Sequence, residues 1–214
     1  MSLKIFYKDS YCANANSIKI AADLSGAEFE SVKTTKEEFT ASKGDKLSLP
    51  YVEVEEQGLS ETNTILRHIA RLNPDSNLYG KSLYESAMID TVLDHAYSLL
   101  EEAIKITCTA LGCRSTTSAD FKADKEKYVA ILKELEKVLD GKDFFVGEGI
   151  TIADIRVASI CAYPFRLLMD PGTAKQVPNL IAHFERISAN ESFKKFFGTT
   201  HVAKRPIKVK FAKK

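Results

Sequence analysis

The chain has 214 residues, of which 44% are hydrophobic and 28% are charged, and its formal net charge is +1. These proportions are ordinary for a globular protein, and the length allows one large domain or two small ones with a sizeable core. No apolar run approaches the ~20 residues that span a bilayer, and the first residues turn polar too soon for a signal peptide, which predicts a cytoplasmic protein without membrane contact.

The first eighty residues alternate between strand-like and helix-like patterns. The expected elements are a strand over 3–7, a helix over 14–24, a strand over 27–32, a short helix over 36–39, a strand over 50–54, a turn at 56–58 and a helix that Thr62 can cap and that ends at Leu72. This order predicts a small α/β domain with a mixed sheet. Asn73-Pro74-Asp75 ends the last helix, so the domain is expected over residues 1–79, with a linker over 80–84.

Strand signals vanish from Leu83 onward, and apolar residues recur at helical spacing instead. The expected helices span 88–108, 124–139, 155–169, 178–187 and 193–197. They predict an all-helical domain over 85–203, followed by a basic tail over 204–214. The predicted fold class is therefore α/β plus all-α.

The third of these helices begins with a capping pattern. Thr151 is a natural N-cap whose hydroxyl can accept from the N–H of Asp154, and the Asp154 carboxylate can accept from the N–H of Thr151. Ile150 and Ile155 have the spacing of a hydrophobic staple. The helix that follows is apolar on almost every side, so we expect it to be buried in the helical core.

The run Gly149-x-Thr151-x-Ala153-Asp154-Ile155, placed in the last third of a chain of this length, resembles the core helix of the glutathione transferase superfamily. The order of the two domains resembles the same superfamily along nearly the whole chain. The resemblance implies an N-terminal thioredoxin-like domain, a C-terminal helical domain, and glutathione as a ligand or substrate.

The resemblance also implies the residues of a glutathione site. Leu49-Pro50 matches the position where the superfamily holds a cis proline, which exposes the preceding backbone to the cysteinyl group of glutathione. Glu61-Thr62 matches the acidic-plus-hydroxyl pair that holds the γ-glutamyl end. A hydroxyl and free N–H groups at a helix N-terminus suit a carboxylate, and Glu61 could pair with the ligand's amino group. A plain helix start at Thr62 and a strand-entry proline at Pro50 are the structural alternatives.

A narrower likeness lies toward the C-terminal end. The residues that carry it are Met169-Asp170-Pro171-Gly172, Val177-Pro178-Asn179, Phe184, Phe193 and Gly198, with Ala21 to Ala27 near the start of the chain. They resemble the N-terminal domain of elongation factor 1-gamma, a subunit of a guanine-nucleotide exchange complex in translation. This likeness implies a scaffold that binds other elongation factor 1 subunits and forms a homodimer. A Lys-rich linker and a further domain follow in that family, which predicts that this chain is a fragment or a shortened relative.

The tail over 204–214 holds six basic residues and no acidic one. Because these six charges exceed the net charge of the whole chain, residues 1–203 carry about −5. The body is therefore a poor nucleic-acid binder. The tail resembles the start of a Lys-rich linker. We expect it to contact RNA or an acidic partner.

Transferases hold the glutathione sulfur near a Tyr or Ser hydroxyl, or form a mixed disulfide with a Cys, just after the first strand. The candidates here are Tyr7, Ser10, Tyr11 and Cys12. Cys12 falls about where Ser-type and Cys-type families keep this group, which makes it the candidate catalytic residue. The favoured alternative is a small buried filler, because Ala13-Asn14-Ala15 lacks the proline that usually follows a catalytic Cys. Tyr7 lies inside the strand, where we expect its ring to be buried.

The histidines and the other cysteines show no metal-ligand spacing. They are His68, His95, His183, His201, Cys108, Cys113 and Cys161. We expect structural histidines, reduced thiols and no metal.

Two hypotheses about function follow, and they leave open whether the protein is an enzyme. The favoured one is a transferase-fold scaffold of the elongation factor 1-gamma type, which binds partner subunits. The alternative is an active cytosolic glutathione S-transferase or a thiol oxidoreductase, which Cys12, Pro50 and the Glu61-Thr62 pair support.

Overall fold

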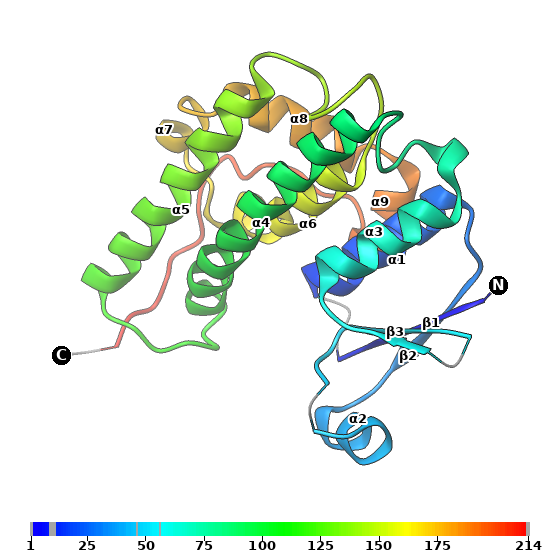
Figure 1. Cartoon of the computed structure of the whole chain (residues 1–214). Helices are drawn as coiled ribbons and strands as arrows, with labels where there is room; N and C mark the ends of the chain where they lie inside the picture. Colours follow the sequence, from blue (N-terminus) through cyan, green and yellow to red (C-terminus); the bar gives the residue numbers. More distant parts are fainter. Residues whose placement is uncertain (1, 9–11, 46, 56, 213–214) are drawn as a thin grey trace.

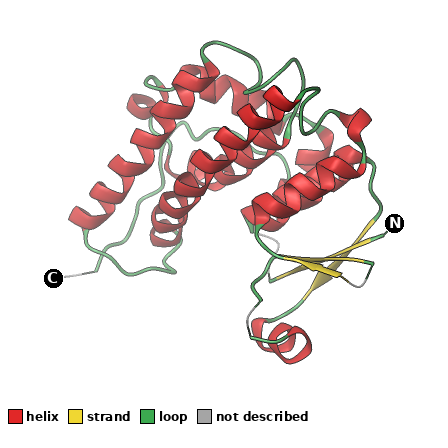
Figure 2. Cartoon of the chain, in the orientation of Figure 1, coloured by secondary structure: helices red, strands yellow, loops and turns green. Residues whose placement is uncertain are grey.

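The computed structural model describes residues 2–8, 12–45, 47–55 and 57–212. An α/β region comes first and an all-helical region follows, as the sequence predicts, and Figure 2 shows the strands confined to the N-terminal part. The strands are β1 (Leu3–Tyr7), β2 (Phe29–Lys33), β3 (Tyr51–Val54) and β4 (Gln57–Leu59). The helices are α1 (Ala13–Ser25), α2 (Lys36–Lys43), α3 (Thr62–Leu72), the 3-10 turn η1 (Pro74–Ser76), α4 (Leu83–Ala110), α5 (Ser118–Leu139), α6 (Ile152–Leu168), α7 (Pro171–Ala174), α8 (Pro178–Ser188) and α9 (Glu191–Phe197).

The sheet has the strand order β2-β1-β3-β4, with β1 parallel to β2 and antiparallel to β3. Helices α1 and α3 pack together over one face of the sheet, and α2 lies on the other side (Figure 1). Phe39 of α2 is buried and meets the ring of Tyr51 edge-on, with 5.4 Å between the ring centres. Phe6 near the end of β1 pairs with Tyr51 at the start of β3, so these two strand ends lie side by side.

Helix α6 occupies the centre of the helical region and packs against α4 and α8. It also packs against α1, so the α/β region and the helical region are in direct contact (Figure 1). The helix is buried along nearly its whole length, as its apolar sequence predicts. Helix α1 makes a second contact with the helical region through α9, where Asp23 accepts from the hydroxyl of Ser192 and pairs with Lys195.

The capping box at the start of α6 is present. One Asp154 carboxylate oxygen accepts from the N–H (2.8 Å) and the hydroxyl (2.6 Å) of Thr151. The other accepts from the N–H of Phe145 (2.9 Å) and lies 2.8 Å from Nε2 of His183. Asp154 is fully buried, so these polar contacts replace all of its water. The carboxylate therefore joins the loop before α6, the first turn of α6 and helix α8.

The basic tail lies along the helical region and ends beside the start of α5 (Figure 1). Two of its backbone N–H groups donate to carbonyls of that region, Ile207 to Leu167 and Ala212 to Thr116, and Ala203 just before the tail donates to Phe165. The ring of Phe211 lies 5.5 Å from the ring of Phe121 on α5. The charged side chains Lys204, Arg205, Lys208 and Lys210 remain exposed. A linker-like extension was expected, but backbone hydrogen bonds and apolar contacts hold this segment to the domain.

Local boundaries differ from the predicted ones in a few places. Helix α4 begins at Leu83 instead of residue 88, because Ser82 caps it by accepting from the N–H of Glu85 (3.1 Å). Helix α3 has Glu61 as its N-cap, and Thr62 is its first helical residue, so the expectation that Thr62 caps this helix is wrong. Of the turn predicted at Glu56-Gln57-Gly58, Glu56 lies outside the described residues, and Gln57 and Gly58 belong to β4, where they pair with β3.

Asp170, the N-cap of α7, has several polar contacts. It accepts from the N–H groups of Gly172 and Thr173 and pairs with Lys125 of α5 at 2.8 Å. Burial alone would raise the pKa of Asp170, but the hydrogen bonds from Lys125 and Thr173 lower this pKa to about 2. The carboxylate therefore stabilises the fold in its charged form.

We predict that Asp154→Ala lowers the free energy of unfolding by about 3 kcal/mol or more, because several buried donors lose their acceptor. The measurement is urea denaturation followed by circular dichroism. Asp143→Ala is the matched control: its carboxylate is exposed and pairs with Arg186 at the surface, so its loss should cost less than about 1 kcal/mol. Equal unfolding midpoints for the two variants would contradict this role of Asp154.

We also predict that Asp170→Asn destabilises the protein at neutral pH but not in acid. The folded-state pKa lies below the unfolded one, so the stabilisation is present above about pH 4 and disappears as the pH falls to about 2. Urea midpoints of the wild type and the variant should converge over this interval. Asp75→Asn, at an exposed carboxylate without an ion pair in the described part of the chain, should leave the midpoint unchanged throughout.

Candidate functional site

A pocket of about 480 Å³ opens between the end of β1, the start of α1, helix α2 and the loop before β3. The lining residues are Tyr7, Lys8, Cys12, Lys36, Phe39, Asp45, Leu47, Ser48, Leu49 and Pro50. The topology explains its place: β1 and β3 are antiparallel neighbours, so the end of β1 lies beside the start of β3. The pocket walls include thiol, phenol, hydroxyl and ammonium groups as well as apolar side chains, which suits a small polar ligand.

The Leu49–Pro50 peptide bond is cis, as the resemblance implies. Both residues line the pocket, with Pro50 buried and Leu49 half-buried. Val52, two residues later, pairs with Ile5 of β1 and with Leu59 of β4. The sheet therefore fixes the backbone just after Pro50. Leu49 directly precedes this fixed stretch and lines the pocket.

Glu61 and Thr62 lie at the start of α3 and are not among the residues that line this pocket. Glu61 has φ +67 and is exposed, and its side chain makes no capping hydrogen bond. A non-glycine residue in this conformation costs of order 1–3 kcal/mol and is typical of ligand sites. Thr62 is 7% exposed at the first position of the helix, where backbone N–H groups lack intrahelical partners.

Of the four candidates for the sulfur-holding group, the structure describes Tyr7 and Cys12; Ser10 and Tyr11 lie outside the described residues. Cys12 is the N-cap of α1 and is half-buried at the pocket wall. Its expected role as a buried filler is therefore wrong. Tyr7 also lines the pocket and is half-buried, so the expectation of a buried ring is wrong too. Both side chains are half-buried because Tyr7 is the last residue of β1 and Cys12 is the residue before α1.

Sequence reasoning missed two cations beside this pocket. Lys19 of α1 is buried, and its ammonium lies 3.3 Å from the centre of the Tyr7 ring. Arg156 of α6 is buried and donates to Asn14 (2.7 Å) and Asn63 (3.1 Å). Burial lowers the pKa of Lys19 and lowers that of Arg156 to about 10, so Arg156 stays charged at neutral pH. The sequence did carry a signal for Arg156: a guanidinium in a helix that is otherwise largely apolar.

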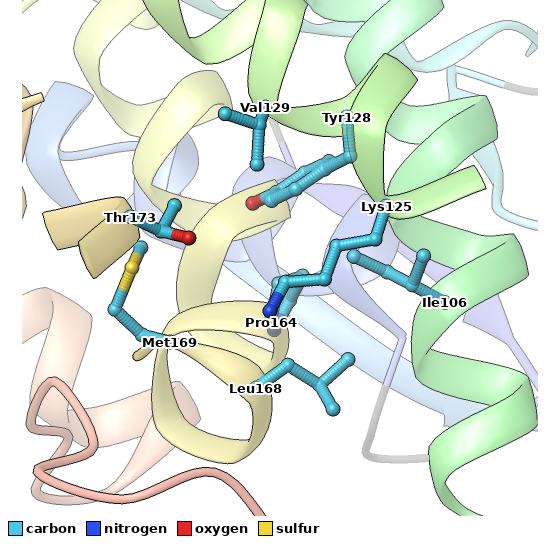
Figure 3. Close-up of a pocket in the computed structure, with 8 residues that line it drawn as sticks. All are labelled: Ile106, Lys125, Tyr128, Val129, Pro164, Leu168, Met169 and Thr173. Carbon is cyan, nitrogen blue, oxygen red and sulfur yellow. The ribbon is translucent and has the colours of Figure 1, made fainter. Parts of the chain in front are cut away.

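A second cavity lies between α4, α5 and the end of α6, where Lys125 and Tyr128 face Met169 and Thr173 (Figure 3). Its volume is about 10 Å³, which is at the lower limit for a single water molecule. It is therefore a gap in the packing, too small to hold a substrate.

The histidines lie apart from the pocket. His183 is buried beside Asp154, whereas His95 is exposed on α4. Residues 2–8, 12–45, 47–55 and 57–212 contain no group of three His, Cys, Asp or Glu side chains that could hold a metal. In the same ranges no helix is long and apolar enough to cross a membrane.

Comparisons with known proteins give the family. The family model described as "Glutathione S-transferase, N-terminal domain" matches residues 3–71, and the one described as "Glutathione S-transferase, C-terminal domain" matches residues 94–191. Human glutathione S-transferase P is 31% identical over 157 residues, which cover 70% of this chain and 68% of that protein. The chain therefore belongs to the glutathione S-transferase family. Its fold is a thioredoxin-like domain followed by a helical domain, as predicted.

Other relatives extend over almost the whole chain. Probable glutathione S-transferase 5 of Caenorhabditis elegans is 28% identical over 211 residues, which cover 94% of this chain and 98% of that protein. The solved structure of glutathione S-transferase-I bound with lactoylglutathione aligns with a TM-score of 0.76 at 19% identity, over 92% of this chain and 99% of that one. At this identity the second likeness concerns the fold alone.

These findings correct the favoured hypothesis about function. The elongation factor 1-gamma of Trypanosoma cruzi is 32% identical over 119 residues, but the match covers 55% of this chain and 28% of that protein. Relatives that match most of both chains are glutathione S-transferases. The scaffold role in the elongation factor complex is therefore wrong, and the alternative fits better. The homodimer and the contact of the tail with RNA or an acidic partner stay predictions.

Proposed function

We propose that the protein is a glutathione S-transferase that joins the sulfur of glutathione to a small electrophile. The observation that carries the proposal is the pocket at the end of β1, where the phenol of Tyr7 and the thiol of Cys12 line the same space as the cis Leu49–Pro50 bond. Membership of the family supports the same reaction. The two ends of glutathione carry carboxylates, and the middle carries the reactive thiol.

Each part of glutathione has a partner in this arrangement. The backbone of Leu49 can hydrogen-bond the cysteinyl backbone, because none of the strand pairings among the described residues includes Leu49. The free N–H groups and the hydroxyl at the start of α3 suit the γ-glutamyl carboxylate, and the Glu61 carboxylate suits its ammonium. Lys8 and Lys36, both exposed at the pocket, offer charge to the glycyl carboxylate.

Tyr7 is the better group for conjugation. A phenolic hydroxyl can donate a hydrogen bond to the glutathione thiolate and so lower the free energy of the nucleophile. A Cys12 thiolate would instead repel a second thiolate beside it. We therefore assign Tyr7 as the hydrogen-bond donor to the glutathione thiolate, and Cys12 has no role in conjugation.

We predict that Tyr7→Phe lowers kcat/KM for conjugation of glutathione with chlorodinitrobenzene by roughly 100-fold, the usual cost of losing one donor to a developing anion. Tyr84→Phe is the matched control, because Tyr84 is 75% exposed on α4 and its loss should not change the rate. Equal rates for the wild type and Tyr7→Phe would contradict the role of Tyr7. Calorimetry that detects no binding at millimolar glutathione would overturn the proposed function itself.

Glu61→Gln should weaken glutathione binding without changing stability. The variant keeps the size of the side chain and removes the charge that pairs with the ligand ammonium, which is worth about 1.5–3 kcal/mol. Calorimetry measures the affinity, and thermal unfolding measures the stability. Glu55→Gln, at another exposed positive-φ position beside β3, should change neither quantity. A loss of affinity as large in Glu55→Gln would show that the effect is not specific to the start of α3.

A further inference from the structure

Two cysteines lie close together at the end of α4. Cys108 belongs to the last turn of the helix, and Cys113 follows shortly after its last residue, Ala110. Cys108 is half-buried and Cys113 is exposed, and both are free thiols in the described part of the chain. Neither is among the residues that line the pocket of the proposed function, so the conjugation chemistry does not account for them.

The backbone between the two cysteines forms a Schellman motif. The N–H of Cys113 donates to the carbonyl of Cys108 (2.8 Å), and the N–H of Gly112 donates to the carbonyl of Thr109 (3.1 Å). Gly112 has φ +80, the left-handed conformation that turns the chain back toward the helix. In this motif the side chains at the positions of Cys108 and Cys113 commonly touch, because the chain returns over the last helical turn. Here both of these side chains are thiols.

The hydrogen bond between the two cysteines also limits their separation. Bond lengths place the Cα atom of Cys108 about 2.4 Å from its carbonyl oxygen and the Cα atom of Cys113 about 1.5 Å from its nitrogen. Since the oxygen and the nitrogen are 2.8 Å apart, the two Cα atoms are separated by at most about 6.7 Å. Disulfides join cysteines whose Cα atoms are about 4.4–6.8 Å apart. The end of α4 can therefore accept a disulfide without a change of fold.

The surroundings give the two thiols different roles. Burial raises the pKa of the Cys108 thiol, and the nearby Cys113 raises it further, whereas Arg114 acts in the opposite direction. Cys113 is exposed, so a disulfide in solution can reach its sulfur directly. Cys113 is therefore the thiol that attacks first, and Cys108 is the neighbour that attacks second.

We propose that the Schellman motif at the end of α4 holds Cys108 and Cys113 as a redox-active pair, which glutathione disulfide oxidises to an intramolecular disulfide. Glutathione reverses the reaction. The pair goes beyond the proposed conjugation and does not depend on it, because the exchange takes place at the exposed thiol of Cys113 and not in the pocket.

The exchange balances with glutathione disulfide as the oxidant. The Cys113 thiolate attacks one sulfur of glutathione disulfide, so that a Cys113–glutathione disulfide forms and one glutathione thiolate leaves. Cys108 loses its proton to water and attacks the sulfur of Cys113. The Cys108–Cys113 disulfide forms, and the second glutathione leaves as a thiolate. Two protein thiols are oxidised, one glutathione disulfide is reduced, and the two glutathione thiolates take up the two protons that the cysteines lost.

The disulfide links α4 to the segment that leads to α5. Arg114, next to Cys113, donates to Asp124 of α5 (2.6 Å). The carbonyl of Thr116 accepts from the N–H of Ala212 in the tail (3.1 Å). Oxidation thus adds a covalent bond close to where α4, α5 and the tail come together. Exposed disulfides are the more easily reduced ones, which suits a reversible modification.

The first test identifies the product. The reduced protein is incubated with glutathione disulfide, its remaining thiols are blocked with N-ethylmaleimide in urea, and its tryptic peptides are measured by mass spectrometry. Cleavage after Lys105 and Arg114 gives the peptide 106–114, which contains both cysteines of the pair and no other cysteine. We expect this peptide to be unblocked and to have lost two hydrogen atoms. A peptide blocked at both cysteines, or one that keeps a glutathionyl group on Cys113, would overturn the proposal.

The second test assigns the two roles. Cys108→Ser should stop the reaction at the mixed disulfide, so its peptide 106–114 should keep one glutathionyl group. Cys113→Ser should react with glutathione disulfide severalfold more slowly, because the half-buried Cys108 then has to attack alone. Cys12→Ser is the matched control, and its pair should close at the wild-type rate. Loss of the Cys108–Cys113 disulfide in folded Cys12→Ser would show that the pocket mediates the oxidation and would overturn the proposal.

The third test asks whether the fold brings the two thiols together. The fraction of the Cys108–Cys113 disulfide is measured at fixed glutathione and increasing glutathione disulfide, in buffer and in urea. We expect half-oxidation of the folded protein at about tenfold less glutathione disulfide than in urea, because the motif raises the effective concentration of one thiol at the other. Equal midpoints would show that the motif does not hold the pair and would overturn the proposal.

Discussion

The placement of helix α6 depends on the buried carboxylate of Asp154. That group accepts hydrogen bonds from Thr151 and Phe145 and lies against His183, so it holds the start of α6 to the preceding loop and to α8. Arg156 follows two residues later, on the same first turns. The contacts of Asp154 that fix the helical core therefore also set where the guanidinium of Arg156 meets the thioredoxin-like domain.

The surface between the two domains combines apolar packing with the buried charge of Arg156. Helix α1 packs against both α3 and α6, and the amides of Asn14 and Asn63 receive Arg156 from the other domain. An apolar residue in place of Arg156 would avoid the cost of burying a charge.

Tyr7 and Cys12 are close in sequence and line the same pocket. Tyr7 ends β1 and Cys12 precedes α1, and a phenol and a thiol therefore line the same pocket. A donor hydroxyl stabilises a bound thiolate, and a protein thiolate attacks a disulfide. Lys19 lies over the ring of Tyr7 and belongs to the helix whose N-cap is Cys12.

The sequence by itself determined the order of strands and helices, the pattern at Thr151 and Asp154 and the proline before β3, because these depend on periodicity and on contacts over a few residues. It did not reveal that Cys12 and Tyr7 share a pocket, nor that the tail lies along the helical domain. Only the tertiary structure placed Arg156 against Asn14, a residue 142 positions away in the chain. The physical reason is that such contacts arise from the packing of α6 on α1, and no local pattern encodes which side chains that packing brings together.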